Sequence, residues 1–177
     1  MKLATVARSG RYLRVADPTW HDPLDAGYSR QRGGRWNPPM TFEVVYLCKT
    51  VRAARANVSR LFAGLPYGPE DLDPKAAPIL VGTDVPRARY LNVVTDPGCT
   101  GLGLPATYPL DDRGEIVGHD RCQPLGQAAW DAGFPGVACR SAARGTVRAD
   151  EELAYFQRDR RLKPAARLSF DAWFWPS

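Results

Sequence analysis

Two adjacent stretches, FEVVYLC from Phe42 to Cys48 and TVRAARANVSRLFAG from Thr50 to Gly64, set the architecture of this chain. β-Branched and aromatic residues fill the first stretch, which predicts a strand. In the second stretch the hydroxyl of Thr50 suits a helix N-cap and Gly64 suits a helix end. Apolar residues recur between them at helical spacing, at Val51, Ala54, Val58 and Leu61. A strand that leads directly into a helix indicates a domain that combines both kinds of element.

Other segments extend this pattern to the rest of the chain. A second helix is expected at Cys122–Ala132, ending at Gly133. Residues 17–39 and 95–119 are polar or rich in Gly and Pro, so they are expected to be loops. Further strands are expected at Arg11–Val15, Ile79–Asp84, Arg89–Val94, Gly136–Cys139, Glu152–Gln157 and Arg167–Phe174. Together these elements predict an α+β fold, with a mixed, mostly antiparallel sheet and a few flanking helices.

The composition is that of a globular domain. The chain has 177 residues, 44% of them hydrophobic, which is enough to build a core without disulfides or metal. No repeat or linker divides it, so residues 1–177 are expected to form a single domain. No apolar run approaches the length of a membrane span, and the N-terminal residues lack the apolar core of a signal peptide. A cytoplasmic protein with no membrane partner is therefore expected.

The charge is moderately positive and is carried mostly by arginine. The net charge is +5, and lysine occurs only at positions 2, 49, 75 and 163. Arginine suits bidentate binding of phosphate better than lysine does, although a GC-rich genome also encodes arginine freely. The basic residues are scattered rather than clustered, so nucleic-acid binding is not expected.

The cysteines give no sign of a metal site. None of the four forms a CxxC pair, and each lies in an apolar or mixed segment, which favours buried small hydrophobic residues. A catalytic cysteine needs a histidine partner, and the only two, His21 and His119, have no recognisable cysteine-protease context. Neither a bound metal nor a cysteine nucleophile is expected.

A further set of residues has the chemistry of a binding site. The stretch GGRWNPP, Gly33 to Pro39, places a cation, an indole and an amide between residues that would by themselves suffice for a turn. Ser141 follows a buried apolar run, where functional side chains are often displayed. Each residue alone also fits a structural role. Arginines bind phosphates and aromatic rings stack on planar bases, so an anionic, ring-bearing ligand would suit Arg14, Arg35, Trp36, Asn37, Tyr46, Asn57 and Ser141.

The order of these motifs resembles that of the RES-domain family, which is named for recurrent Arg, Glu and Ser positions. The resemblance covers nearly the whole chain. Its most specific part is GGRWN followed, about one strand later, by a Tyr-Leu pair and an Ala-rich helix. The matching segments are YLRV at 12–15, GGRWN at 33–37, VVYL at 44–47, the helix that follows, GFPGVACRSA at 133–142 and ELAYF at 152–156.

The resemblance implies a fold like that of ADP-ribosyltransferases and a toxin that consumes NAD. It also implies a helix-turn-helix (Xre-type) antitoxin that covers the active site. Arg35 matches the family Arg and Ser141 the family Ser, whereas Arg14 and Tyr46 match further pocket positions. By this resemblance the two arginines would clamp the pyrophosphate or orient the ribose, and Ser141 would hydrogen-bond the ligand. Tyr46 and Trp36 would shape the nicotinamide side, and Trp36 and Asn37 would shape or brace the corner that carries Arg35.

This chain departs from the family pattern at one position. The family Glu falls at Asn57, and an amide carries no charge and is no useful base. Three explanations are open: a slow enzyme in which Asn57 holds the ribose, an enzyme in which Glu152 or Glu151 has taken over, or a protein that binds NAD without cleaving it. The resemblance predicts an NAD glycohydrolase, phosphorylase or ADP-ribosyltransferase with Arg35, Asn57 and Ser141 as catalytic positions. The alternative prediction is a catalytically impaired NAD-binding relative.

Overall fold

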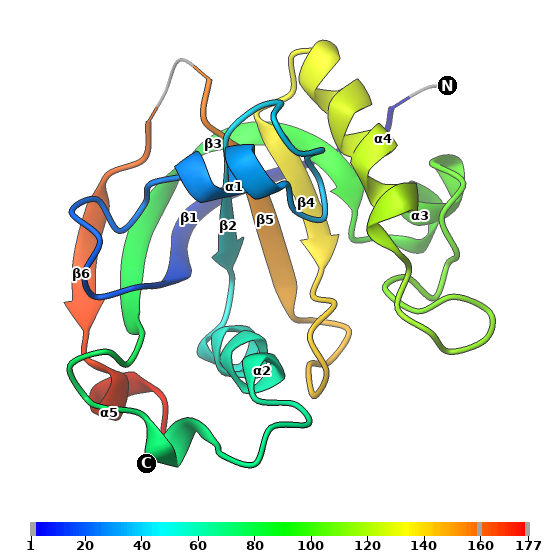
Figure 1. The fold of residues 1–177 in the computed structure, drawn as a ribbon. Coiled ribbons are helices and arrows are strands. Elements are labelled where there is room, and N and C mark those ends of the chain that lie inside the picture. The colour runs from blue at the N-terminus through cyan, green and yellow to red at the C-terminus, as the bar shows by residue number, and fades with distance from the viewer. Residues whose placement is uncertain (1–2, 159–160, 176–177) are drawn as a thin grey trace.

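The structure, a computed structural model, describes residues 3–158 and 161–175 and contains a six-stranded sheet (Figure 1). The expected domain of residues 1–177 thus includes positions outside the described ranges. Neighbouring strands are antiparallel except β3 and β4, which are parallel. The predicted α+β fold with a mixed, mostly antiparallel sheet is confirmed. The strands are β1 (Thr5–Ala16), β2 (Val44–Cys48), β3 (Ile79–Val93), β4 (Gly136–Arg140), β5 (Glu151–Phe156) and β6 (Pro164–Leu168), in the order β1-β2-β5-β4-β3-β6.

The sheet closes on itself through its first strand. β1 pairs with β2 on one side and with β3 along nearly its whole length on the other, which joins β1, β2, β5, β4 and β3 in a ring. The closure between β1 and β2 is slight, because Leu13 opposite Cys48 is their one paired position among the described residues. Beyond Leu13 the two strands separate. The pairing of β1 with β2 is thus the shortest in the ring.

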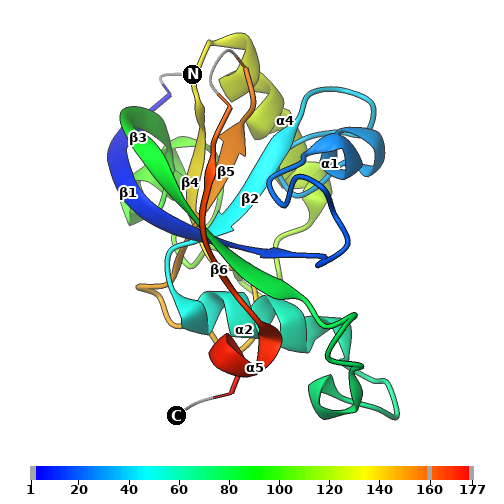
Figure 2. The ribbon, with the colours of Figure 1, turned by 90° about the vertical axis from the view of Figure 1, so that its left-hand side faces the viewer.

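Five α-helices pack around the sheet within the described ranges: α1 (Gly27–Arg32), α2 (Val51–Leu61), α3 (Asp96–Gly101), α4 (His119–Asp131) and α5 (Phe170–Trp173). Figures 1 and 2 both place α2 below the lower end of β2. In Figure 1, α3 and α4 lie on the side of β4 that faces away from β6. The Thr50 hydroxyl accepts a hydrogen bond from the Ala53 amide, as expected for the N-cap of α2. The strand predicted at Phe42–Cys48 and the helix predicted after Thr50 are both confirmed, as β2 and α2.

Some expected element boundaries are wrong. The predicted strand Arg167–Phe174 ends at Leu168 and is followed by α5, because Phe170, Trp173 and Phe174 recur at helical spacing and pack on one another. The two strands expected at 79–84 and 89–94 are one continuous strand, β3. The expected loops 17–39 and 95–119 contain α1 and α3, two helices of only six residues each, too short to show a clear apolar period.

The core lies on both sides of the sheet. One cluster gathers Trp36, Phe42 and Tyr108 beneath α3 and α4, and a second contains Tyr12 and Tyr90. A third lies between α2, α5 and the adjoining strands. The four cysteines are free and buried, as expected of small apolar residues.

Candidate active site

A cavity of about 330 Å³ opens where β1 and β2 separate. Residues of β1, β2, α2, β5 and the GGRWN turn line it, so its walls come from segments far apart in the sequence. It brings together most of the predicted site residues, namely Arg14, Arg35, Trp36, Tyr46 and Asn57, and adds Tyr28, Arg60, His119 and Glu152. The remaining two, Asn37 and Ser141, lie one contact behind the wall, hydrogen-bonded to Tyr46 and Glu152 respectively.

The GGRWN turn is tied to β2 by one phenol. The Tyr46 hydroxyl accepts a hydrogen bond from the Trp36 amide at 2.9 Å and donates one to Asn37 Oδ1 at 2.8 Å. The Asn37 amide nitrogen in turn donates to the carbonyl oxygens of Ser29 and Phe42. Burial raises the pKa of Tyr46, so the phenol keeps the proton that it donates. These hydrogen bonds therefore hold the GGRWN turn against β2, the strand whose residues line the cavity.

Glycine is required at two points where this turn meets its neighbours. A Cβ at Gly34 would lie 2.4 Å from the Tyr46 hydroxyl oxygen, and one at Gly126 would lie 1.7 Å from the Trp36 carbonyl oxygen. Helix α4 therefore packs directly on the turn. The indole of Trp36 is 1% exposed and belongs to the core, so it bounds the cavity from the inside rather than standing free in it.

Arg35 extends from the turn toward the start of α4. Its Nη1 donates to the Val117 carbonyl oxygen at 2.7 Å and lies 3.7 Å from Cys122 Sγ. The Gln123 amide donates to the Gly34 carbonyl oxygen at 2.9 Å, which joins the same two segments a second time. These contacts fix the Arg35 guanidinium at the cavity wall.

Arg14 is the second cation of the cavity, and it is 9% exposed. Its Nη2 donates to the Asp25 carbonyl oxygen at 2.7 Å, whereas Nη1 is buried and has no hydrogen-bond partner within residues 3–158 and 161–175. Burial lowers the pKa of Arg14 to about 10, so it stays charged at neutral pH. A buried cation with an unpaired donor is costly unless a ligand completes it. Because Arg14 lines the cavity, its positive charge favours an anionic ligand there.

A carboxylate lines the same cavity as these arginines. Glu152, at the start of β5, accepts hydrogen bonds at the same atom, Oε1, from Asn57 Nδ2 at 2.8 Å and from Ser141 Oγ at 2.7 Å. Asn57, the position at which the resemblance places the family Glu, thus contacts an acid of another element. Glu151, the other acid considered, instead forms an ion pair with Arg8 and does not line the cavity.

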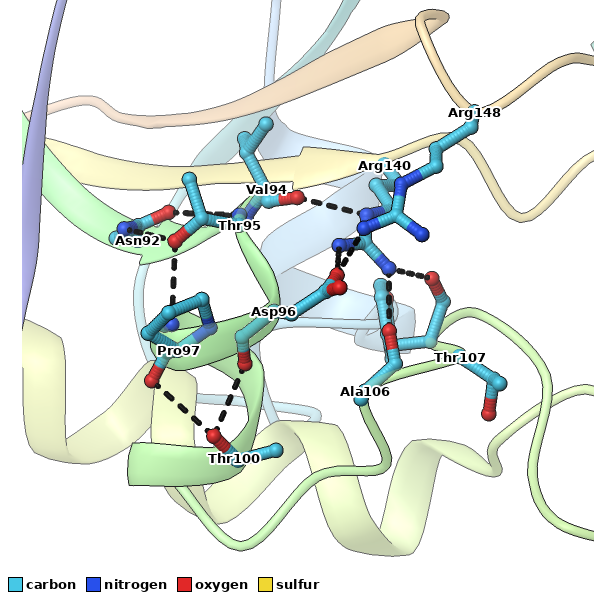
Figure 3. Close-up of polar contacts among 12 residues, drawn as sticks. Asn92, Val94, Thr95, Asp96, Pro97, Thr100, Ala106, Thr107, Arg140 and Arg148 are labelled. Carbon is cyan, nitrogen blue, oxygen red and sulfur yellow. Dashed lines mark hydrogen bonds and ion pairs between the residues drawn. The ribbon is translucent and has the colours of Figure 1, made fainter.

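Arg140 holds the segment that carries Ser141, and nothing in its sequence context marks it for this role. It is 3% exposed, and it donates to the carbonyl oxygens of Val94, Ala106 and Tyr108 at 2.7 to 2.8 Å. Figure 3 shows it converging with Arg148 on the carboxylate of Asp96. The end of β4 is thereby joined to β3, to α3 and to the loop beyond it.

Asp150 is a second buried support that the sequence did not reveal. Its carboxylate is fully buried, accepts a hydrogen bond from the Thr50 hydroxyl at 2.7 Å and forms an ion pair with Arg52 at 2.7 Å. Its carbonyl oxygen accepts from the Ser141 amide at 2.9 Å. One residue therefore links the start of α2, which carries Asn57, to the segment of Ser141.

Two further basic residues line the cavity, Arg60 and His119, both exposed. The pKa of His119 is lowered, first by partial burial and then by the charges of Arg35 and Arg60. His119 is therefore neutral at pH 7. The permanent positive charge of the cavity rests on its arginines.

The molecule is an α+β protein whose sheet closes on itself. The cavity between β1 and β2, lined by two arginines and a glutamate, resembles the cleft of an enzyme. The chain belongs to the RES domain family, whose model matches residues 3–172. It is 31% identical over 153 residues to proteins named NAD(+) phosphorylase MbcT in Mycobacterium tuberculosis and Mycobacterium bovis, covering 85% of this chain and 76% of theirs.

A comparison with solved structures also finds a similarity to MbcT, in this case in the fold. The fold is similar to that in the crystal structure of the M. tuberculosis MbcT–MbcA toxin–antitoxin complex, with a TM-score of 0.75 and 25% sequence identity. The match covers 93% of this chain and 86% of the other. Within the described part of this chain, the helices are all too short or too polar to cross a membrane.

Proposed function

We propose that this protein consumes NAD by cleaving the bond between nicotinamide and ribose in the cavity between β1 and β2. The observation that carries the proposal is the presence of both charges in that cavity, since two arginines, Arg14 and Arg35, and one glutamate, Glu152, line it together. NAD has the complementary division, because its pyrophosphate is negative and its nicotinamide ring is positive. The relationship to proteins named NAD(+) phosphorylase supports the same substrate.

The residues suit the two halves of NAD differently. A guanidinium binds a pyrophosphate through paired N–H groups, and both Arg14 and Arg35 line the cavity. Cleavage of the nicotinamide–ribose bond develops positive charge on the ribose, as glycoside cleavage does. A carboxylate beside that sugar stabilises the charge. Tyr46 and the turn that it holds shape the nicotinamide end.

The reaction exchanges one bond at the ribose anomeric carbon for another. The carbon–nitrogen bond breaks, and its electron pair moves to the ring nitrogen, so nicotinamide leaves as a neutral molecule. The anomeric carbon then forms a bond to an oxygen of inorganic phosphate, or to water, which gives up a proton. We propose phosphate as the preferred acceptor, since the related mycobacterial proteins are named phosphorylases. No redox change or metal ion is needed to balance this transfer.

We also propose that the enzyme is the toxin of a toxin–antitoxin pair. The similar solved structure is a toxin–antitoxin complex. The family resemblance indicates a helix-turn-helix (Xre-type) partner that covers the cavity and keeps NAD out. NAD is an intracellular substrate, so the proposal puts the reaction in the cytoplasm. We further propose that the chain acts as a single domain.

The test is release of nicotinamide from NAD by the purified protein, with and without phosphate. Wild-type protein is expected to release nicotinamide faster with phosphate, and Arg35→Ala is the matched inactive control. No release above that control at high protein concentration would rule out the proposal.

A second candidate function is NAD binding without turnover, which Asn57 favours because it replaces the expected acid. Calorimetry separates the two. Binding of NAD with no nicotinamide release would support the binding protein, whereas binding with release supports the enzyme.

A further inference from the structure

We infer that Glu152 is the carboxylate of this site, in place of the acid expected on α2 at position 57. The inference rests on the proposed function and names the residue that would face the ribose. Glu152 lines the cavity together with both arginines, and it comes from β5 rather than from α2. The acid has thus moved from a helix to a strand while remaining in the same cavity.

The hydrogen bonds around Glu152 leave half of its carboxylate available. Both donors that contact Glu152 among the described residues, Asn57 Nδ2 and Ser141 Oγ, are bound to Oε1. Among the described residues no hydrogen bond is made to Oε2. One oxygen therefore orients the group, and the other can accept a hydrogen bond from a ribose hydroxyl or lie beside the developing positive charge.

This arrangement explains why the residue at position 57 is an amide. A second carboxylate there would lie about as close to Glu152 as Asn57 does, and two like charges so close cannot both be ionised without a large penalty. Asparagine avoids the repulsion and donates a hydrogen bond instead. The Asn57 side chain is also held by its own helix, because its Nδ2 donates a hydrogen bond to the Ala53 carbonyl oxygen at 3.1 Å. Asn57 and Ser141 are therefore positioning residues for Glu152.

The chain supplies its own matched control in the next residue. Glu151 precedes Glu152 on β5, so its side chain points to the opposite face of the sheet. There it forms two hydrogen bonds with Arg8, at 2.6 and 2.8 Å, outside the cavity. Glu151 and Glu152 are both glutamates of β5, but only Glu152 lines the cavity.

The first experiment compares Glu152→Gln with Glu151→Gln in the nicotinamide-release assay. Glutamine keeps the size of the side chain and an oxygen that Asn57 and Ser141 can contact, but it removes the charge. We expect Glu152→Gln to lower kcat by about 100-fold or more, with KM changed only a few-fold, because the charge acts in the transition state. Glu151→Gln should keep kcat within about twofold.

The second experiment exchanges the two positions. Asn57→Glu alone should lower activity at neutral pH, since it creates the close carboxylate pair. The double variant Asn57→Glu/Glu152→Asn returns one acid and one amide to the same contact. It should recover at least tenfold in kcat over Glu152→Asn alone. Circular dichroism and NAD calorimetry show that each variant is folded and still binds NAD.

The outcomes separate this inference from the function on which it rests. Absence of nicotinamide release from the wild type would contradict the proposed function. An active wild type together with Glu152→Gln of equal kcat would overturn the inference alone. A rise in kcat on Asn57→Glu would also overturn it, because it would mean that the acid belongs on α2.

Discussion

Tyr46 is the single side chain on which the geometry of the turn depends. Its hydroxyl serves the Trp36 amide and Asn37 at once. Tyr46→Phe leaves the Trp36 amide and the side-chain oxygen of Asn37, Oδ1, without this partner in a buried setting, which costs about 1 to 3 kcal/mol. We therefore expect a lower free energy of unfolding in urea and reduced nicotinamide release. Tyr67→Phe, at a position 52% exposed, is the control and should change neither.

Arg14 offers a sharp test of ligand binding. Arg14→Lys keeps a positive charge but loses the paired donors of the guanidinium. We expect NAD to bind about tenfold more weakly, equivalent to roughly 1.4 kcal/mol, as measured by calorimetry. Arg11→Lys changes an exposed arginine of the same strand, paired with Asp84, and should leave binding unchanged. Equal affinities for wild type and Arg14→Lys would remove Arg14 from the site.

Many of the residues that line this cavity could be predicted from the type of their side chains and their order along the chain. Arg14, Arg35, Tyr46 and Asn57 were recognised from their motifs, and the structure puts all four around one cavity. Arg140 and Asp150 were not recognised, because each acts through partners that are dozens of residues away. A buried arginine or aspartate looks like a surface residue in the sequence until its distant partners are known. The catalytic and binding roles themselves stay predictions.

Helix α4 touches the GGRWN turn without any space between them. Gly126→Ala would drive a Cβ into the Trp36 carbonyl oxygen. Overpacking of this kind costs typically about 1 to 3 kcal/mol, and here the obstacle is backbone. We expect a clear loss of stability in urea and a loss of activity, because the turn carries Arg35. Gly101→Ala, in α3 with nothing near its added Cβ, should be neutral or stabilising by up to about 1 kcal/mol.

The Asp96 cluster makes stability depend on acidity. The hydrogen bond from Arg140 lowers the pKa of Asp96 below its usual value of 3.8, and the charge of Arg148 adds to this. Between the two pKa values the unfolded chain binds more protons, so stability falls as the pH drops below about 4. Thermal melts at pH 7, 4 and 3 should show this loss. In Asp96→Asn the melting temperature should be lower at pH 7 and should fall less toward pH 3.

Secondary structure could be predicted where the residues of a segment show a clear periodicity. It could not be predicted where contacts with distant segments determine whether the segment is a strand or a helix. The strand Val44–Cys48 and the helix Val51–Leu61 carry clear periodicity, and both are present. The segment after Leu168 contains the same aromatic residues that favour strands, but packing of Phe170 and Trp173 beside α2 makes it helical. The pairing of β1 with β3 could not be read from either strand alone, because it joins residues about 75 positions apart.

Ligand binding should stabilise the molecule as a unit, because the cavity joins β1, β2, α2 and β5. A non-cleavable NAD analogue at 100 times its Kd adds about 2.7 kcal/mol to the free energy of unfolding. For a chain of this size that is a rise of roughly 5 to 10 °C in melting temperature. Differential scanning calorimetry measures it. Arg14→Lys at the same analogue concentration should show a smaller rise, and an absent shift in wild type would argue against an NAD site.

The ring of strands has a consequence for when activity can begin during synthesis. One wall of the cavity comes from β1, near the start of the chain, and Glu152 comes from β5, near its end. A ribosome that has made the chain only as far as residue 140 holds both arginines but has not yet made the acid or the strand that joins β2 to β4. Under the proposed function, a chain that is still being translated would therefore not consume NAD. Consumption would begin only after the last strands of the ring emerge, which would leave the period of translation for the proposed antitoxin partner to be made.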